Sequence, residues 1–167
     1  MNSSELAVSR YEAVGKIIEE YKTSLRIDDE TYTLYSGLFS LYQGRPLMFY
    51  DAMAQLSGSK QYEDLVQDIQ HAQKMGTQAA TSQELYTNGL VALTLLQHNY
   101  VRIAQKRAVA LRSRDEKYIL PVQILAQSAL LQKHRQEAAQ YFDMLLKIDT
   151  THTDQHHFGL CISHFRQ

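Results

Sequence analysis

Apolar side chains along this chain recur every three or four residues, which is the spacing of one face of a helix. Asp28 suits the start of a helix and Gly44 its end, and Pro46 suits the first turn of the next helix. Gly76 is predicted to end a further helix. The pattern therefore predicts an all-α fold of about nine helices, over residues 4–25, 28–43, 46–57, 60–75, 82–97, 100–113, 118–132, 134–148 and 153–166.

The clearest feature of the second half is a 34-residue repeat. Four residues recur at this spacing, namely Ala92, Ala104, Leu111 and Asp115, which reappear as Ala126, Ala138, Leu145 and Asp149. A period of this length, with small residues at two of the shared positions, is typical of helix–turn–helix units that bury their apolar faces only by stacking. Because such arrays usually hold other proteins, the repeat predicts a binding protein and not an enzyme.

These units resemble the tetratricopeptide repeat family. In residues 134–149, Ala138 and Phe142 match the small and aromatic positions of the second helix of a unit. In the first helices, Ala92 and Ala126 each follow a large apolar residue, which resembles the pair that lets two helices approach closely.

The resemblance is clearer over residues 85–150 and weaker over 30–75. Glu116 and Thr150 replace the proline that usually closes a unit of the family. Membership implies a tetratricopeptide-like α-solenoid, in which antiparallel helix pairs form a right-handed superhelix with a concave groove.

The whole chain is interpreted as a single helical repeat domain in four parts. These are an N-terminal helix (1–27), divergent helix pairs (28–76), two clearer repeats (82–150) and a C-terminal helix (153–167). The N-terminal helix carries apolar residues at heptad-like spacing from Ala7 to Leu25. It is expected either to pack on the array or to form the seam of a homodimer.

Family members bind peptides or helices in the concave groove, which the first helix of each pair lines. Carried over residue by residue, the resemblance predicts a groove lined by Leu34, Leu38, Leu41, Tyr42, Tyr86, Gly89, Leu90, Leu93, Leu96, Gln123, Gln127, Leu130 and Leu131. This apolar set with a few amides lacks the basic and Asn residues with which one branch clamps a terminal carboxylate. The alternative is that many of these leucines belong to the core.

The function implied by the resemblance is that of a non-enzymatic adaptor or chaperone for another protein. An apolar or amphipathic partner segment suits the predicted groove. Short proteins of this kind resemble the chaperones of bacterial secretion systems. A structural scaffold subunit of a multiprotein complex is the alternative.

Composition and charge narrow the class of partner. A net charge of −1, with 44% apolar and 21% charged residues, is ordinary for a globular protein. Positive charge gathers on a predicted basic face of Arg102, Lys106 and Arg107, without the interleaved aromatics of a nucleic-acid surface. No apolar run approaches the roughly 20 residues that span a bilayer, and the single cysteine, Cys161, fits a reducing compartment. A cytoplasmic protein that neither binds nucleic acid nor inserts into membranes is expected.

Residues that could bind a metal ion or act as a nucleophile are found together only in the last predicted helix. His157, Cys161 and His164 are spaced so that one helical face carries all three, which makes them weak candidates for a metal site or a cysteine nucleophile. A structural zinc site usually needs a fourth ligand, and no phosphate loop, nucleophile motif or His-Glu-x-x-His motif is present. No catalytic residue and no cofactor are therefore expected, and a metal or cysteine enzyme is the least favoured interpretation.

Overall fold

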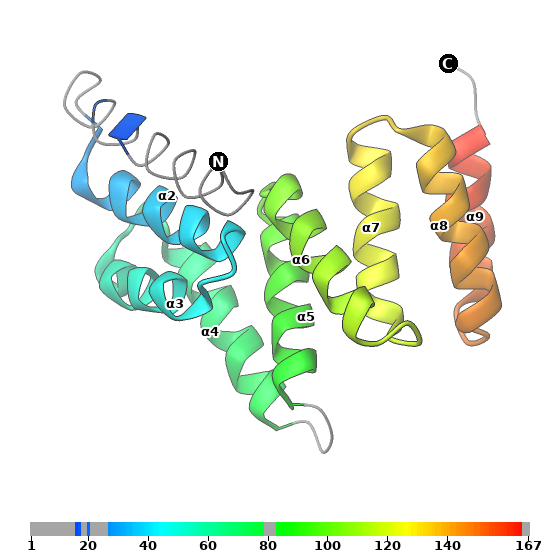
Figure 1. Ribbon diagram of the computed structural model, residues 1–167, viewed down its shortest axis with the longest axis horizontal. Coiled ribbons are helices and arrows are strands. Elements are labelled where there is room, and N and C mark those ends of the chain that lie inside the picture. Colours follow the sequence, from blue (N-terminus) through cyan, green and yellow to red (C-terminus); the bar gives the residue numbers. More distant parts are fainter. Residues whose placement is uncertain (1–15, 18–19, 21–26, 79–82, 165–167) are drawn as a thin grey trace, which may run out of the picture. The chain divides into compact units, whose positions relative to one another are not determined.

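The computed structural model describes residues 16–17, 20, 27–78 and 83–164, and 82% of these are helical. The described part of the chain contains no strand, so the all-α prediction is confirmed. Its elements are α2 (Asp29–Tyr42), α3 (Pro46–Gln55), the short 3-10 helix η1 (Leu56–Gly58), α4 (Glu63–Thr77), α5 (Gln83–Gln97), α6 (Val101–Arg114), α7 (Ile119–Leu131), α8 (Arg135–Ile148) and α9 (Thr153–His164) (Figure 1).

Two of the sequence predictions fall largely outside the described residues. These are the apolar seam from Ala7 to Leu25 and most of the loop between the fourth and fifth predicted helices. Among the described helices, none is both long and apolar enough to cross a membrane.

The chain divides into two compact units, residues 1–59 and residues 60–167. In the first unit, α2 and α3 form a hairpin whose ends follow the sequence prediction. Asp28 caps α2, because its Oδ1 accepts a hydrogen bond of 2.8 Å from the backbone N–H of Thr31. Gly44 lies in the turn with a φ of 83°, which strongly favours glycine, and Pro46 is the first residue of α3.

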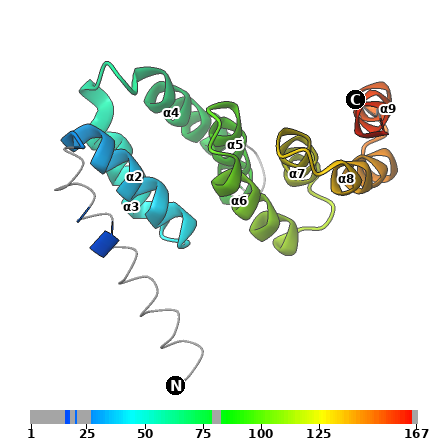
Figure 2. The same cartoon turned by 90° about the horizontal axis from the view of Figure 1, so that it is seen from above.

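The second unit contains α4 to α9, and each helix packs against the next along the chain (Figure 2). In addition, α5 contacts α7, so the first helices of the two 34-residue repeats are neighbours. The four alanines of the repeat are completely buried, namely Ala92, Ala104, Ala126 and Ala138. They therefore occupy equivalent core positions, where small side chains allow paired helices to approach closely.

The turns inside the two repeats are copies of one another. Asn99 and Lys133 both have positive φ values, of 65° and 61°. The N–H of Asn99 donates to the carbonyl of Leu96, and the N–H of Lys133 donates to that of Leu130, both at 3.0 Å. The 34-residue spacing found in the sequence thus holds for the backbone conformation as well as for the core.

One predicted helix end is wrong. Helix α4 continues through Gly76 to Thr77, and Gly76 is buried inside it. A Cβ atom at Gly76 would lie 2.6 Å from the Cα of Thr87 on α5, closer than real Cβ contacts allow. The glycine therefore permits a close approach of α4 and α5, which sequence alone does not distinguish from a helix stop.

Candidate partner-binding face

The neighbouring helices α5 and α7 expose residues that together form the candidate site, and three pairs of them are related by the 34-residue repeat, namely Tyr86 and Leu120, Leu93 and Gln127, and Gln97 and Leu131. We call this the α5–α7 face and define it by Tyr86, Leu90, Leu93, Gln97, Leu120, Gln123, Gln127 and Leu131, all of which are half-buried or exposed. Leu131 is 57% exposed and Tyr86 is 37% exposed. Gln97 and Leu120 were missed from the sequence, although they lie 34 positions from Leu131 and Tyr86 and the repeat spacing identifies them.

Four leucines assigned to the groove are core residues instead. Their exposed fractions are between 1% and 4%, and they are Leu34, Leu38, Leu41 and Leu96. These side chains pack inside their own units and are inaccessible to a partner. Tyr42 is 39% exposed, but it lies on α2 in the other unit. Leu130 is half-buried and packs against the core between α7 and α8.

The α5–α7 face carries no charged side chain. Its apolar residues alternate with the amides of Gln97, Gln123 and Gln127. Two arginines of α6 bond across to α5: Nη2 of Arg107 donates to the amide Oδ1 of Asn88 at 2.6 Å, and Nη1 of Arg114 lies 3.0 Å from the carboxylate Oε1 of Glu84.

The two arginines also lower the pKa of the neighbouring carboxyl of Glu84. The hydrogen bond from Arg114 lowers the pKa of the Glu84 carboxyl, and the charge of Arg107 lowers it further. The Glu84 carboxylate therefore stays ionised and paired. A neutral, apolar segment suits the face better than a charged one.

Tyr118 closes one end of the face. It comes from the loop between α6 and α7, and its hydroxyl oxygen is the atom nearest to the position that a Cβ atom of Gly89 on α5 would take; the Tyr118 Cζ would be 3.0 Å from that position and Cδ2 of Leu120 3.1 Å. Burial, and to a lesser extent the neighbouring Tyr86, raise the pKa of Tyr118 to about 12. Its hydroxyl is buried without a hydrogen-bond partner. No sequence pattern pointed to Tyr118.

The three residues of the predicted basic face are not equally exposed. Arg102 and Lys106 are exposed on α6, but Arg107 is half-buried and reaches across to Asn88 on α5. One of the three charges therefore serves the contact between α5 and α6.

The structure does not bring the candidate metal ligands together. His157, Cys161 and His164 are all exposed on α9. Within the described residues, no group of three or more His, Cys, Asp or Glu side chains is placed to hold a metal ion.

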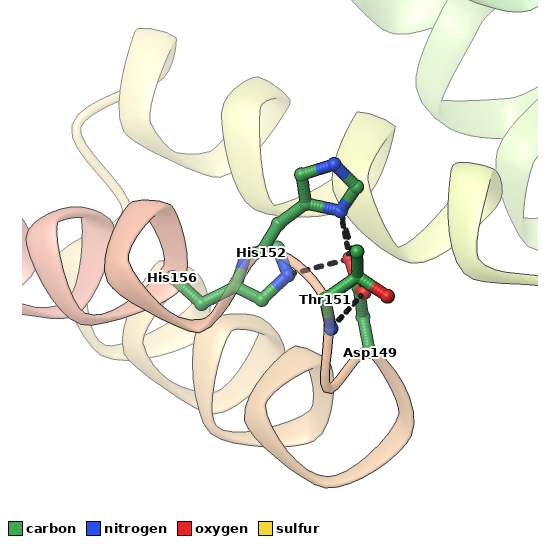
Figure 3. Close-up of polar contacts among 4 residues, drawn as sticks. All are labelled: Asp149, Thr151, His152 and His156. Atoms are coloured by element: carbon green, nitrogen blue, oxygen red, sulfur yellow. Dashed lines mark hydrogen bonds and ion pairs between the residues drawn. The ribbon is translucent and has the colours of Figure 1, made fainter.

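Two other histidines form the polar cluster that anchors α9. Oδ2 of Asp149 lies 2.9 Å from Nε2 of His156 and 3.1 Å from Nδ1 of His152, and Oδ1 accepts a 3.0 Å bond from the N–H of Thr151 (Figure 3). Asp149 and His156 are each 3% exposed. The hydrogen bond to His156, followed by those from Thr151 and His152, lowers the pKa of the Asp149 carboxyl to about 2. The cluster joins the end of α8 to the first turns of α9.

The outer side of α9 is a second apolar surface. Phe158 is 69% exposed and Ile162 is 43% exposed, whereas the buried Gly159 lies directly against the ring of Phe142 on α8. The second unit therefore exposes apolar side chains on the α5–α7 face and on this side of α9. No family model, curated protein or solved structure matches the chain.

Proposed function

We propose that this chain is a non-enzymatic protein-binding module that holds a segment of another protein on the α5–α7 face. In this proposal the hairpins α5–α6 and α7–α8 stack as a tetratricopeptide-like α-solenoid, in which the α5–α7 face is the concave groove. The observations that support it most are the repetition of the turn and of the buried alanines in the two hairpins, and the contact between α5 and α7, the helices that carry the face.

The proposed ligand is an uncharged, predominantly apolar segment. Burial of a leucine side chain contributes about 1.5–3 kcal/mol, and the ordering of both partners offsets part of it. Apolar contact should therefore dominate the affinity, and added salt should weaken binding only slightly because it screens exposed charges. An adaptor or chaperone of the cytoplasm would bind its partner in this way.

The proposal is tested by capture from a lysate of the native host, followed by mass spectrometry. Leu93→Glu and Leu131→Glu place a carboxylate on the face, and each is expected to reduce capture of the same protein at least roughly 100-fold. Val109→Glu is the matched control, because Val109 is 50% exposed on α6 and lies outside the face. Circular dichroism before capture verifies that each variant is folded.

Two results would contradict the proposal. One is capture that survives both substitutions on the face. The other is capture that is lost when Arg102 and Lys106 are neutralised, which would assign binding to the outer side of α6.

A scaffold subunit is the second candidate function, and the exposure of Phe158 supports it. In that case α9 would be covered in a stable assembly. Phe158→Glu would then abolish co-purification of the partner, while Leu131→Glu would leave it intact.

A further inference from the structure

Helix α9 buries small and polar residues and exposes apolar ones. Its buried residues are His156, Gly159 and Ser163, and Leu160 is half-buried against the core between α7 and α8. Phe158 and Ile162 lie one helical turn apart, and both are exposed. We call these two residues the α9 stripe. The stripe is apolar surface that the packing of α9 on α8 leaves uncovered.

The neighbouring helix α8 has the opposite distribution. It buries Ala138, Phe142 and Leu145, and its exposed residues from 136 to 147 are all polar, namely Gln136, Gln140, Asp143 and Lys147. That is the usual pattern of a helix with one packed side. Helix α9 is instead joined to α8 by the bonds of Asp149 and the contact of Gly159 with Phe142, without the stripe. The stripe is therefore available for a second contact.

The α9 stripe has the chemical character that the α5–α7 face is proposed to bind. From Gln155 to His164 the chain contains no Asp, Glu, Lys or Arg, and the face contains none either. The two surfaces can therefore come together without the cost of burying a permanent charge. The exposed Leu47 and Met48 of α3 differ in this respect, because the exposed charges of Arg45 and Asp51 lie within four residues of them.

The spacing of the stripe also suits the face. Phe158 and Ile162 are four residues apart, as are Leu93 and Gln97 on α5, and Gln127 and Leu131 on α7. Rows of side chains at this spacing interdigitate when helices pack, and an amphipathic helix lying in an apolar groove makes its contacts in this way.

The stripe meets such a face only on another molecule. Within one chain, Phe158 and Leu131 are both exposed while α9 packs on α8. A second copy offers the same face without loss of the contacts between α8 and α9. The occupant that fits the stripe is therefore a second copy of this chain.

We propose that the α9 stripe of one copy binds the α5–α7 face of a second copy. This inference rests on the proposed function, because it uses the same face and identifies a competitor for it. The contact is heterologous, so a pair of copies retains one free face and one free stripe, and further copies can add. A partner segment that binds the face displaces α9 of the neighbouring copy. Self-association thereby covers the apolar face when the partner is absent.

Sedimentation equilibrium of the full chain tests the contact. The average mass of the wild type is expected to rise with protein concentration. Phe158→Glu and Leu131→Glu each place a carboxylate on one of the two surfaces, so each should weaken self-association at least roughly 100-fold. Val109→Glu is the matched control, because Val109 is exposed on α6 and belongs to neither surface. Circular dichroism verifies that the variants are folded.

A mixture of the two variants identifies the surfaces that meet. The Phe158→Glu protein keeps its α5–α7 face, and the Leu131→Glu protein keeps its stripe. Each alone should remain a single chain, whereas the equimolar mixture should form a complex of two chains and nothing larger, because the other face and the other stripe are blocked. The double variant should associate with neither single variant.

Three results would overturn this inference. The wild type could remain a single chain up to about 1 mM, a concentration at which even weak contacts are populated. Leu131→Glu could self-associate as the wild type does, which would assign association to another surface. The mixture could remain as single chains although each substitution alone prevents self-association.

Capture of the partner separates this inference from the proposed function. Phe158→Glu leaves the face free, so it should still capture the partner from a lysate. If it does so and the wild type never self-associates, this inference fails and the proposed function stands. If self-association requires Leu131 and capture does not, the proposed function fails and this inference stands.

Discussion

The loops that follow α6 and α8 share a backbone and differ in what their side chains do. Each begins with an aspartate that ends the helix and accepts a hydrogen bond from the N–H two residues on. After α6, Asp115 is exposed, and Tyr118 lies against the buried Gly89 of α5. After α8, Asp149 is buried, and His152 turns back to it.

The 34-residue repeat therefore determines the backbone path of the two loops, whereas equivalent side chains in the two loops make different contacts. Val122 of α7 belongs to the apolar core between α7 and α8, whereas its equivalent on α9, His156, is bonded to Asp149. In the loop after α6, Tyr118 covers Gly89 of α5. In the loop after α8, His152 and His156 bond to Asp149 and join α9 to the end of α8.

The largest expected effect is the loss of α9 docking in Asp149→Asn. This change removes the charge that the buried His156 and the N–H of Thr151 share, so two bonds weaken at once. Hydrogen exchange should show reduced protection throughout α9 and little change in α5. Asp115→Asn is the matched control, because Asp115 is exposed and should leave protection in α7 unchanged. Equal effects of the two substitutions would refute the distinction between the loops.

The same comparison predicts how stability depends on pH. The pKa of Asp149 is lowered from 3.8 to about 2, so the folded state favours the ionised form more than the unfolded state does. Its contribution is therefore fully present above about pH 4 and is lost as the pH falls from about 4 to about 2. Urea unfolding of the wild type should weaken over this range more than that of Asp149→Asn. Asp28 and Glu84 also have lowered pKa values, so only the difference between variants is diagnostic.

The sequence predicted the helices well because their ends are local. The cap at Asp28, the turn at Gly44 and the position of Pro46 depend on residues within a few positions, and the structure confirms all three. The 34-residue repeat also predicted which alanines are buried, because equal spacing implies equal neighbours.

The sequence could not show which side of each first helix is covered. Aligning Gly44 with Asn99 places Ser36 and Ser40 of α2 at the positions of Val91 and Leu95 of α5. Both serines are half-buried, whereas Val91 and Leu95 are 2% and 0% exposed. Helix α2 therefore buries a narrower stripe than α5, made of Leu34, Gly37, Leu38 and Leu41, so Leu34 and Leu38 belong to the core and not to an accessible groove.

The polar cluster was missed for a related reason. His152 and His156 stand four residues apart in the sequence, but the residue that bonds to both is Asp149, which the sequence identifies only as one of the residues that recur after 34 positions. Whether such an aspartate is buried depends on how α9 packs on α8. Local spacing carries no information about that contact.

The smallest difference between the two repeats is expected in the stability lost when equivalent core residues are substituted. Ala104 and Ala138 are both fully buried, each in the second helix of its repeat. Replacing either with leucine adds atoms that the core has no room for, at a cost of about 1–3 kcal/mol. Because the turns before the two helices have the same backbone conformation, the two losses measured by urea unfolding should be of similar size. A clear loss for one alanine and none for the other would show that the repeats share their turns and not their cores. In that case the two repeats would differ in the packing of their cores as well as in the side-chain contacts of their loops.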